Sequence, residues 1–433
     1  MACNTVFKDL ITLFPTWNEL QDYLQSNAGG NFRVVHKKGD LCLIRYQKGF
    51  SKMDLPHSMW FRSVVWNTVT NRPISVAPPK VSSMDIPFKT MEEMSEKGVL
   101  CQEQLDGFMI NCFRKVDDEA LYITSRSKLD AAGHFYSSKS FRTLFIESYM
   151  RISPDSNSDT ETLIQTYGKD MESPDVSKNE IAVCYSFLVQ HVEHRIVTPV
   201  YENKTYLVHK CILYEDGSMV INDIDPVCRG HETIPCIEYR SLEPVHQMDA
   251  PEQVFPVSDV IKWINTFFKT KSWDFQGIVF KDTAGNRWRF RNDKYSIVKS
   301  LRGNTSTALE RFSQLYTQNL LYQYLQYYPD DNFYFSCYTT FMSMIVDYVY
   351  RYYIELFVTK TLHKDAIDKM YIPHLYAIHN LYLTSLRPNK KKVSPYQITS
   401  YFHGQPWQRI SFLIKKYQDV YFLRMGEIVE GGQ

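Results

Sequence analysis

The sequence predicts an α+β fold in which antiparallel sheets are followed by an all-helical C-terminal part. Short segments of alternating apolar and polar residues, separated by turn residues, fill most of residues 1–305. From residue 306 to 433 the pattern changes, because apolar residues and tyrosines recur at spacings of three and four, as in Phe341, Ile345 and Tyr348. We therefore expect two domains with these bounds, and a two-layer core in the first.

The first elements are predicted as helix, hairpin and single strands. Residues 5–26 are amphipathic and predict one helix or two short ones, which the turn residues at 27–31 end. Residues 32–46 alternate on both sides of a Lys37–Asp40 turn, which is typical of a hairpin. We expect further strands at 61–67 and 74–77, and a short polar helix at 91–98.

Further strands and helices are predicted in the middle and at the end of the chain. A strand pair is predicted around the Asp106-Gly107 turn, and residues 153–179 predict a polar insertion. The other strands are expected at 120–124, 181–190 and 205–213, and as a hairpin at 275–281 and 287–291. The helices are expected at 257–270, 307–328, 333–361, 364–384 and 405–423, with a basic loop at 387–395.

Composition excludes several classes of protein. The 433 residues suffice for two or three domains, and the net charge of +1 provides no overall basic field for nucleic acid, so any RNA contact must come from a local patch. The nine cysteines include no C-x-x-C pair, and no uncharged window of about 20 residues is present. We expect an intracellular, cytoplasmic protein in a reducing environment, with no membrane span and no disulfide framework.

Common catalytic and metal-binding patterns are missing from the sequence. It contains no G-x-x-x-x-G-K-[ST] loop and no G-x-S-x-G elbow. His191 and His194 are close in sequence, but a spacing of three on a strand would place the two rings on opposite faces. We therefore expect no metal site from these histidines.

The tetrapeptide Gln104-Leu105-Asp106-Gly107 is the most informative motif. By itself an Asp-Gly pair predicts a hairpin turn. Here, other motif-like segments accompany the pair, in order along the chain. They are the segments at 61–67, 72–80, 185–187, 194–197, 275–280 and 287–295.

Together these segments resemble the motifs of the bacteriophage-type ATP-dependent RNA ligases, the tRNA-repair type that is also found in some large DNA viruses. The resemblance covers roughly residues 30–300. It implies a covalent nucleotidyltransferase core of the ligase and capping-enzyme type, with ATP and Mg²⁺ as cofactors. In that family a lysine amine attacks the α-phosphate of ATP and forms an enzyme–AMP intermediate. Gln104 occupies the position of that lysine.

The resemblance also implies a nucleotide-binding set. Its members in this chain are Arg62, Lys80, Gln104, Asp106, Gly107, Ser186, Arg195, Gln276, Arg289 and Arg291. A carboxamide cannot replace the nucleophilic amine, so we assign no catalytic residue. Ser186 and Gln276 stand where the family has glutamates, which weakens the expected Mg²⁺ binding because this ion prefers carboxylate oxygens. Arg289 and Arg291 replace lysines and retain the ability to bind phosphate.

Three functions fit these departures. The first is a ligase-like pseudoenzyme that has lost adenylyl transfer and binds RNA or a protein partner. The second is an active ATP-dependent RNA ligase, whose nucleophile is another lysine such as Lys97 or Lys115, or whose own lysine has been replaced at Gln104. The third is a structural subunit of a larger assembly, with the tyrosine-rich helices as its interface.

Partners and compartment follow from the first function. For RNA, and tRNA in particular, we expect phosphate contacts from the basic loop residues Lys390, Lys391 and Lys392. A viral origin would place the protein in the host cytoplasm.

Overall fold

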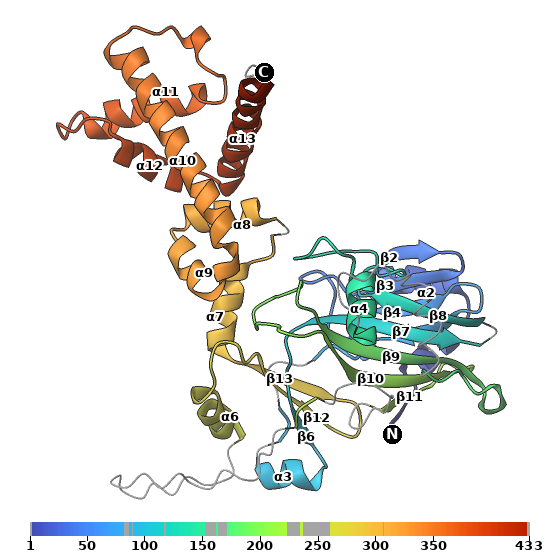
Figure 1. The fold of residues 1–433 in the computed structure, drawn as a ribbon. Coiled ribbons are helices and arrows are strands. Elements are labelled where there is room, and N and C mark those ends of the chain that lie inside the picture. The colour runs from blue at the N-terminus through green and yellow to red at the C-terminus, as the bar shows by residue number, and fades with distance from the viewer. Residues whose placement is uncertain are drawn as a thin grey trace, which may run out of the picture. The chain divides into compact units, whose positions relative to one another are not determined.

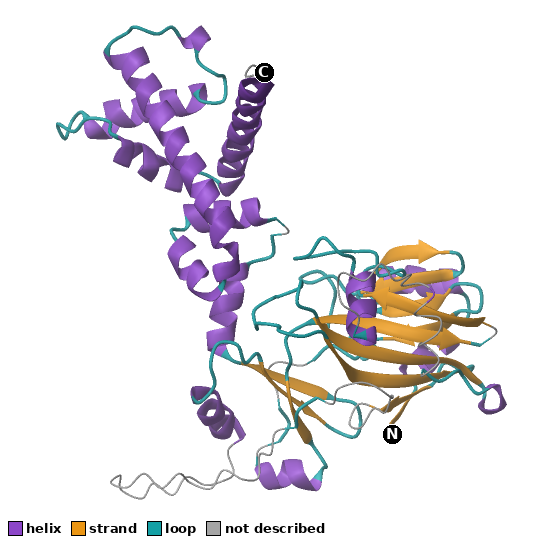
Figure 2. Cartoon of the chain, viewed as in Figure 1, coloured by secondary structure: helices purple, strands orange, loops and turns teal. Residues whose placement is uncertain are grey.

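The computed structural model describes residues 2–81, 86–88, 90–116, 118–151, 162, 171–222, 234–236, 260–305 and 307–430. The chain divides into two compact units, residues 1–296 and 297–433. The first unit combines antiparallel sheets with short helices, and the second is helical (Figures 1 and 2). The predicted α+β class with a helical C-terminal region is therefore confirmed at this level.

The chain begins with a short strand, two helices and a four-stranded sheet. The order in the sheet is β2-β3-β4-β5, and every neighbouring pair is antiparallel. Helix α2 starts at a capping box, in which Thr16 and Glu19 satisfy each other's backbone N–H groups. The bounds are β1 Ala2–Asn4, α1 Val6–Leu13, α2 Trp17–Gln25, β2 Arg33–Lys38, β3 Leu41–Arg45, β4 Val64–Asn67 and β5 Arg72–Val76.

A six-stranded sheet forms the largest layer of the first unit, in the order β1-β11-β10-β9-β7-β8. Its long central strands are almost completely buried, as their continuous apolar sequences require. Helix α4, residues Phe141–Met150, packs on β8, β9 and β10 (Figure 1). The strands are β7 Phe108–Lys115, β8 Asp118–Ser125, β9 Glu180–Gln190, β10 Lys204–Tyr214 and β11 Met219–Asn222.

A smaller sheet in the order β13-β12-β6 completes the unit. Helix α6 covers it, and Trp263 of α6 packs with Phe280 and Trp288 of the sheet in one apolar core. The helix α3 precedes β6, and α7 follows β13. The bounds are α3 Met91–Glu96, β6 Leu100–Glu103, α6 Val260–Lys269, β12 Gly277–Lys281, β13 Arg287–Arg291 and α7 Asp293–Arg302.

The strand pair predicted around Asp106-Gly107 is wrong in its pairing. Strands exist on both sides of the turn, but β6 pairs with β12 whereas β7 pairs with β8 and β9. The turn is thus a crossing from the small sheet to the large one. An Asp-Gly pair gives a hairpin only when the two adjacent strands pair with each other. Here both strands pair with strands from other parts of the sequence.

Two apolar cores lie on opposite faces of the six-stranded sheet. On one face, Phe113 and Cys184 pack with Ile44 and Trp66 of the four-stranded sheet. On the other face, Tyr185 packs with residues of α4. Successive side chains of a strand point to opposite faces, so β7 and β9 contribute to both cores.

The second unit is a set of helices with an aromatic core. The expected helix at 307–328 is two helices, because Asn319 adopts the left-handed conformation between them. The sequence pattern did not predict the helix at Pro395–His403, which Pro395 opens in its first turn. The bounds are α8 Ala308–Thr317, α9 Leu321–Tyr327, α10 Asn332–Tyr353, α11 Ile372–Leu381, α12 Pro395–His403 and α13 Trp407–Glu430.

Most other predicted elements are confirmed, namely the two N-terminal helices, the hairpins at 33–45 and 277–291 and the long strands β9 and β10. Helices α4 and α7 were not predicted.

The insertion expected at 153–179 lies mostly outside the described residues. Of the helices that the structure describes, none combines the length and the apolar character that a membrane crossing would need.

Candidate functional site

The site residue Asp106 anchors the crossing between β6 and β7. Its side chain is buried, and Oδ2 accepts the backbone N–H groups of Val197 at 2.8 Å and Thr198 at 3.0 Å. Its other oxygen, Oδ1, accepts the hydroxyl of Tyr295 at 2.8 Å. Gln190 donates to the backbone carbonyl of Asp106 at 2.9 Å. Asp106 therefore joins the crossing to β9, to the loop after β9 and to α7.

Gly107 is required by a close approach to β9. A Cβ atom at this position would lie 2.5 Å from the carbonyl oxygen of Val189, which is closer than any real contact. The crossing therefore lies directly on β9, and any side chain at position 107 would push the two strands apart. The Asp-Gly pair is thus an architectural element that fixes the position of Gln104.

Gln104 lies beside the end of the small sheet. Its backbone N–H donates to the carbonyl of Gly277 at 2.8 Å, and Gly277 is paired with Arg291. Gln276 immediately precedes Gly277 and is buried. The structure thus brings Gln104, Gln276 and Arg291 together, although they come from three separate parts of the sequence. The side-chain oxygen Oε1 of Gln104 is buried and has no hydrogen-bond partner among the described residues.

Strand β13 presents its arginines on one face. The sequence Arg287-Trp288-Arg289-Phe290-Arg291 alternates, so the three arginines point away from the core that contains Trp288. Arg287 is buried and donates from Nη2 to the carbonyl of Val208 at 3.0 Å. Arg289 and Arg291 lie close enough for the charge of Arg291 to lower the pKa of Arg289, in addition to the larger effect of burial.

Arg62 and Arg126 belong to the same group of charges. Burial lowers the pKa of Arg62 to about 10, and the neighbouring charges of Arg126, Arg287 and Arg289 act in the same direction. We refer to Arg62, Arg126, Arg289 and Arg291 as the arginine cluster. Its members come from the segment before β4, the loop after β8 and strand β13.

Tyr46 stands at the centre of this group. The guanidinium carbon of Arg126 lies 4.7 Å from the centre of the Tyr46 ring, and Nζ of Lys80 lies 5.5 Å from it. Both distances fall in the range of cation–π contacts. Lys80 and Arg126 are exposed, so the arginine cluster is open to solvent on this side.

No carboxylate of the described residues balances these charges. In the part of the chain that the structure describes, no member of the arginine cluster forms an ion pair with aspartate or glutamate. The Nε atom of Arg291 is buried and has no acceptor there. Buried donors that lack a partner are unfavourable, and an anion would supply both the acceptor and the missing charge. Guanidinium groups in such an arrangement are able to bind an anion with several oxygens, such as a phosphate.

Two of the expected site residues are engaged elsewhere. Ser186 is buried in β9, and its hydroxyl donates to Oδ1 of Asn111 at 2.7 Å within the six-stranded sheet. Arg195 uses Nε to bind the carbonyl of Val197 at 3.0 Å, in the loop that Asp106 holds. Ser186 is thus part of the sheet's hydrogen bonding, and Arg195 stabilises the loop beside the site.

The lysines considered as alternative nucleophiles also have other partners. Lys97 pairs with Glu93 at 3.1 Å at the end of α3, and Lys115 pairs with Asp118 at 3.3 Å. Lys115 is the last residue of β7, whereas Gln104 precedes the first. Lys390, Lys391 and Lys392 are exposed in the loop of the second unit that precedes α12.

Sequence reasoning missed Tyr46, Arg126 and Tyr295 as members of the site. Tyr295 lies in the last motif segment, so the sequence alone shows that it is near Arg291. Its hydrogen bond to Asp106 joins residues 189 positions apart, and the sequence pattern does not predict it. Arg126 follows a predicted strand in a Ser-Arg-Ser turn, and nothing in that pattern points to Tyr46. These contacts arise only when the sheets pack.

The sequence matches no protein-family model, and it matches none of the curated protein sequences.

Proposed function

We propose that the first unit is a degenerate RNA ligase-like nucleotidyltransferase domain that binds a nucleotide phosphate without forming a covalent adenylate, and that the protein acts as an RNA-binding module. The observation that carries this proposal is the arginine cluster, which lacks carboxylate partners among the described residues and lies next to the segment containing Gln104. A ligand with several negative oxygens complements such a surface.

The chemistry of Gln104 supports binding without catalysis. Its amide nitrogen is delocalised into the carbonyl and cannot attack the α-phosphate as a lysine amine does. Arginine side chains stay protonated, so Arg289 and Arg291 hold phosphate but do not transfer protons. Ser186 and Gln276 provide no carboxylate for Mg²⁺, and the hydroxyl of Ser186 is already bonded to Asn111. Anion binding should therefore depend little on the metal ion.

The active-ligase alternative is weaker. It needs an amine in line with the α-phosphate, whereas Lys97 is paired with Glu93 of α3 and Lys115 with Asp118 of β8. Lys80 belongs to the site, but its backbone N–H is bound to the carbonyl of Met59 and its amine lies against the Tyr46 ring. A covalent label from α-labelled ATP would favour this alternative.

A partner-binding role has one observation in its favour. In the second unit, Tyr322, Phe333 and Tyr334 expose 80%, 72% and 53% of their surfaces. Exposed aromatic residues are enriched at protein interfaces. Such an interface is compatible with RNA binding, and sedimentation of the purified protein over a range of concentrations would detect self-association through these residues.

Calorimetric titration with ATP tests the proposed function. We expect Arg62→Ala and Arg289→Ala each to weaken ATP binding by about 10- to 100-fold, since each removes a charge-assisted hydrogen bond. Arg351→Ala, which removes an arginine from the second unit, is the matched control and should leave the affinity unchanged. Replacing Mg²⁺ by EDTA should change wild-type affinity little. Equal affinities for all variants would refute the assignment of the arginine cluster.

A further inference from the structure

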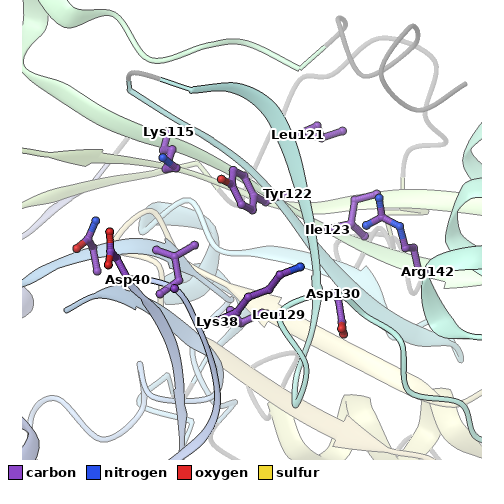
Figure 3. A pocket seen from close by; sticks show the side chains of 12 residues that line it. Lys38, Asp40, Lys115, Leu121, Tyr122, Ile123, Leu129, Asp130 and Arg142 are labelled. Carbon is purple, nitrogen blue, oxygen red and sulfur yellow. The ribbon is translucent and has the colours of Figure 1, made fainter. Parts of the chain in front are cut away.

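The first unit contains a cavity that none of the proposed nucleotide-binding residues lines. It has a volume of about 760 Å³ and lies between the two larger sheets (Figure 3). Lys38 at the end of β2 and Asp40 in the following turn form one wall. Tyr122 of β8 and Arg142 of α4 belong to the other. The volume is within the range of small-ligand sites.

Positive side chains enter this cavity from three elements. Lys115 is already paired with Asp118 at 3.3 Å. Lys38 is exposed and forms no ion pair with any described residue. Figure 3 places Asp40 and Arg142 at opposite ends of the cavity, with Lys38 between them and Asp130 on the side toward which the Lys38 amine points. Lys38 is therefore the cation that we expect a ligand to bind.

The remaining walls suit a ligand that also has an apolar part. Leu41, Ile123 and Leu129 contribute aliphatic surface. Tyr122 is fixed, because its ring stacks on Phe113 with centroids 4.8 Å apart and its hydroxyl donates to Asp118. A rigid, mostly apolar wall with an adjacent cation matches a ligand that combines a ring with an anionic group.

Strand β3 connects this cavity with the arginine cluster. Leu41 at the start of β3 lines the cavity, and Arg45 at its end lies near Arg126, whose charge adds to the effect of burial in lowering the pKa of Arg45. Four residues of an extended strand span about 13 Å. The loop after β8 makes the same connection, because Arg126 and Leu129 are three positions apart.

We propose that this cavity is a second nucleotide-phosphate site, in which Lys38 holds the phosphate and the aliphatic wall packs against the base. The proposal rests on the function proposed above, since it extends a phosphate-binding surface away from the arginine cluster. A free mononucleotide and one nucleotide of an RNA strand present the same chemistry to Lys38. The experiment therefore contains an arm for each source.

The RNA arm compares Lys38→Ala with the matched control Lys37→Ala. Lys37 is the preceding residue of the same strand, does not line the cavity and lies 3.5 Å from Oε1 of Gln21. Fluorescence anisotropy with a labelled single-stranded oligonucleotide is measured at two salt concentrations. For Lys38→Ala we expect a five- to tenfold loss of affinity and a salt-dependence slope smaller by about 0.7, as when one phosphate is no longer neutralised. Lys37→Ala should behave as wild type.

The mononucleotide arm measures the stoichiometry of AMP by calorimetry. We expect two AMP per chain for wild type and for Lys37→Ala, and one for Lys38→Ala. A lower stoichiometry without an effect on the oligonucleotide would support the site and identify a free mononucleotide as its ligand. If Lys38→Ala matches Lys37→Ala in both arms, the second site is refuted. This result would not refute phosphate binding by the arginine cluster, because that binding is tested separately by titrating Arg62→Ala with ATP.

Discussion

The hydroxyl of Tyr295 donates a hydrogen bond to Oδ1 of Asp106 over 2.8 Å, and so connects the crossing between two sheets with the first turn of α7. Tyr295 is fully buried, and its ring lies 5.9 Å from the guanidinium carbon of Arg291. One buried pair thus positions the segment that contains Gln104 and a member of the arginine cluster. This part of the site is therefore built on strand β13 and helix α7.

Removing this hydroxyl should destabilise the first unit. We expect Tyr295→Phe to lower the free energy of unfolding by about 1.5–3 kcal/mol, because it deletes a hydrogen bond to a buried carboxylate. Tyr201→Phe is the control, since Tyr201 exposes 89% of its surface in the same unit. Denaturant unfolding measures both variants. A decrease no larger than that of the control would show that the Asp106–Tyr295 bond does not hold the crossing in place.

Restoring the lysine alone should not restore ligase chemistry. Gln104→Lys returns the amine, but Ser186 and Gln276 still lack the carboxylates that Mg²⁺ prefers. We therefore expect no covalent label from α-labelled ATP with this variant. Full labelling of the single variant would mean that the rest of the site is intact and that only the nucleophile has been replaced.

The basic loop of the second unit should contribute to RNA binding. Replacing Lys390, Lys391 and Lys392 by alanine should weaken tRNA binding and flatten its salt dependence, by roughly 0.7 to 0.9 in slope for each phosphate that the loop neutralises. The three side chains are exposed, so folding should be unaffected. Affinities at two salt concentrations provide the test. An unchanged slope would remove the loop from the RNA interface and favour a role in assembly.

The second unit should lose stability in mild acid because of His374. This side chain is buried, and its Nδ1 forms a hydrogen bond with the Tyr401 hydroxyl at 2.9 Å. Burial lowers the pKa of His374 to about 4, and Arg409 acts in the same direction. Since an unfolded histidine has a pKa near 6.5, the stabilisation is complete above about pH 6.5 and is lost as the pH falls toward about 4.

The expected decrease in the free energy of unfolding over this interval is on the order of 2 kcal/mol. His374→Gln should flatten the pH dependence of unfolding, whereas His363→Gln should not, because the His363 side chain is 75% exposed. Denaturant unfolding at pH 7, 5.5 and 4.5 checks this. Parallel curves for wild type and His374→Gln would contradict the assignment.

The sequence predicts local structure in this chain better than long-range structure. Hairpins such as 33–45 were correct because their turn and their alternation lie in one short segment. The crossing at Asp106-Gly107 was mistaken for a hairpin, because the partners of its strands, β12 and β9, come much later in the sequence. No local signal specifies such pairings.

In the candidate site too, the sequence identifies some residues, whereas the contacts between distant segments appear only in the structure. The family resemblance pointed to Arg62, Arg289 and Gln104. In the structure Arg289 lies near Arg62, and Gln104 is bonded to Gly277, which pairs with Arg291. Tyr46 and Arg126 could not be found this way, since their roles depend on contacts between separate loops and strands. Ser186 was placed correctly on a strand, but its bond to Asn111 depends on the pairing of β9 with β7.

The central claim is that this site binds a nucleotide phosphate without attaching it to the protein. Incubation with α-labelled ATP and Mg²⁺, followed by separation of one half under native and the other under denaturing conditions, tests it most directly. We predict label on the native protein and none after denaturation. Label that survives denaturation would demonstrate a covalent adenylate and an active enzyme, and absence of label under native conditions would mean that the arginine cluster does not bind ATP.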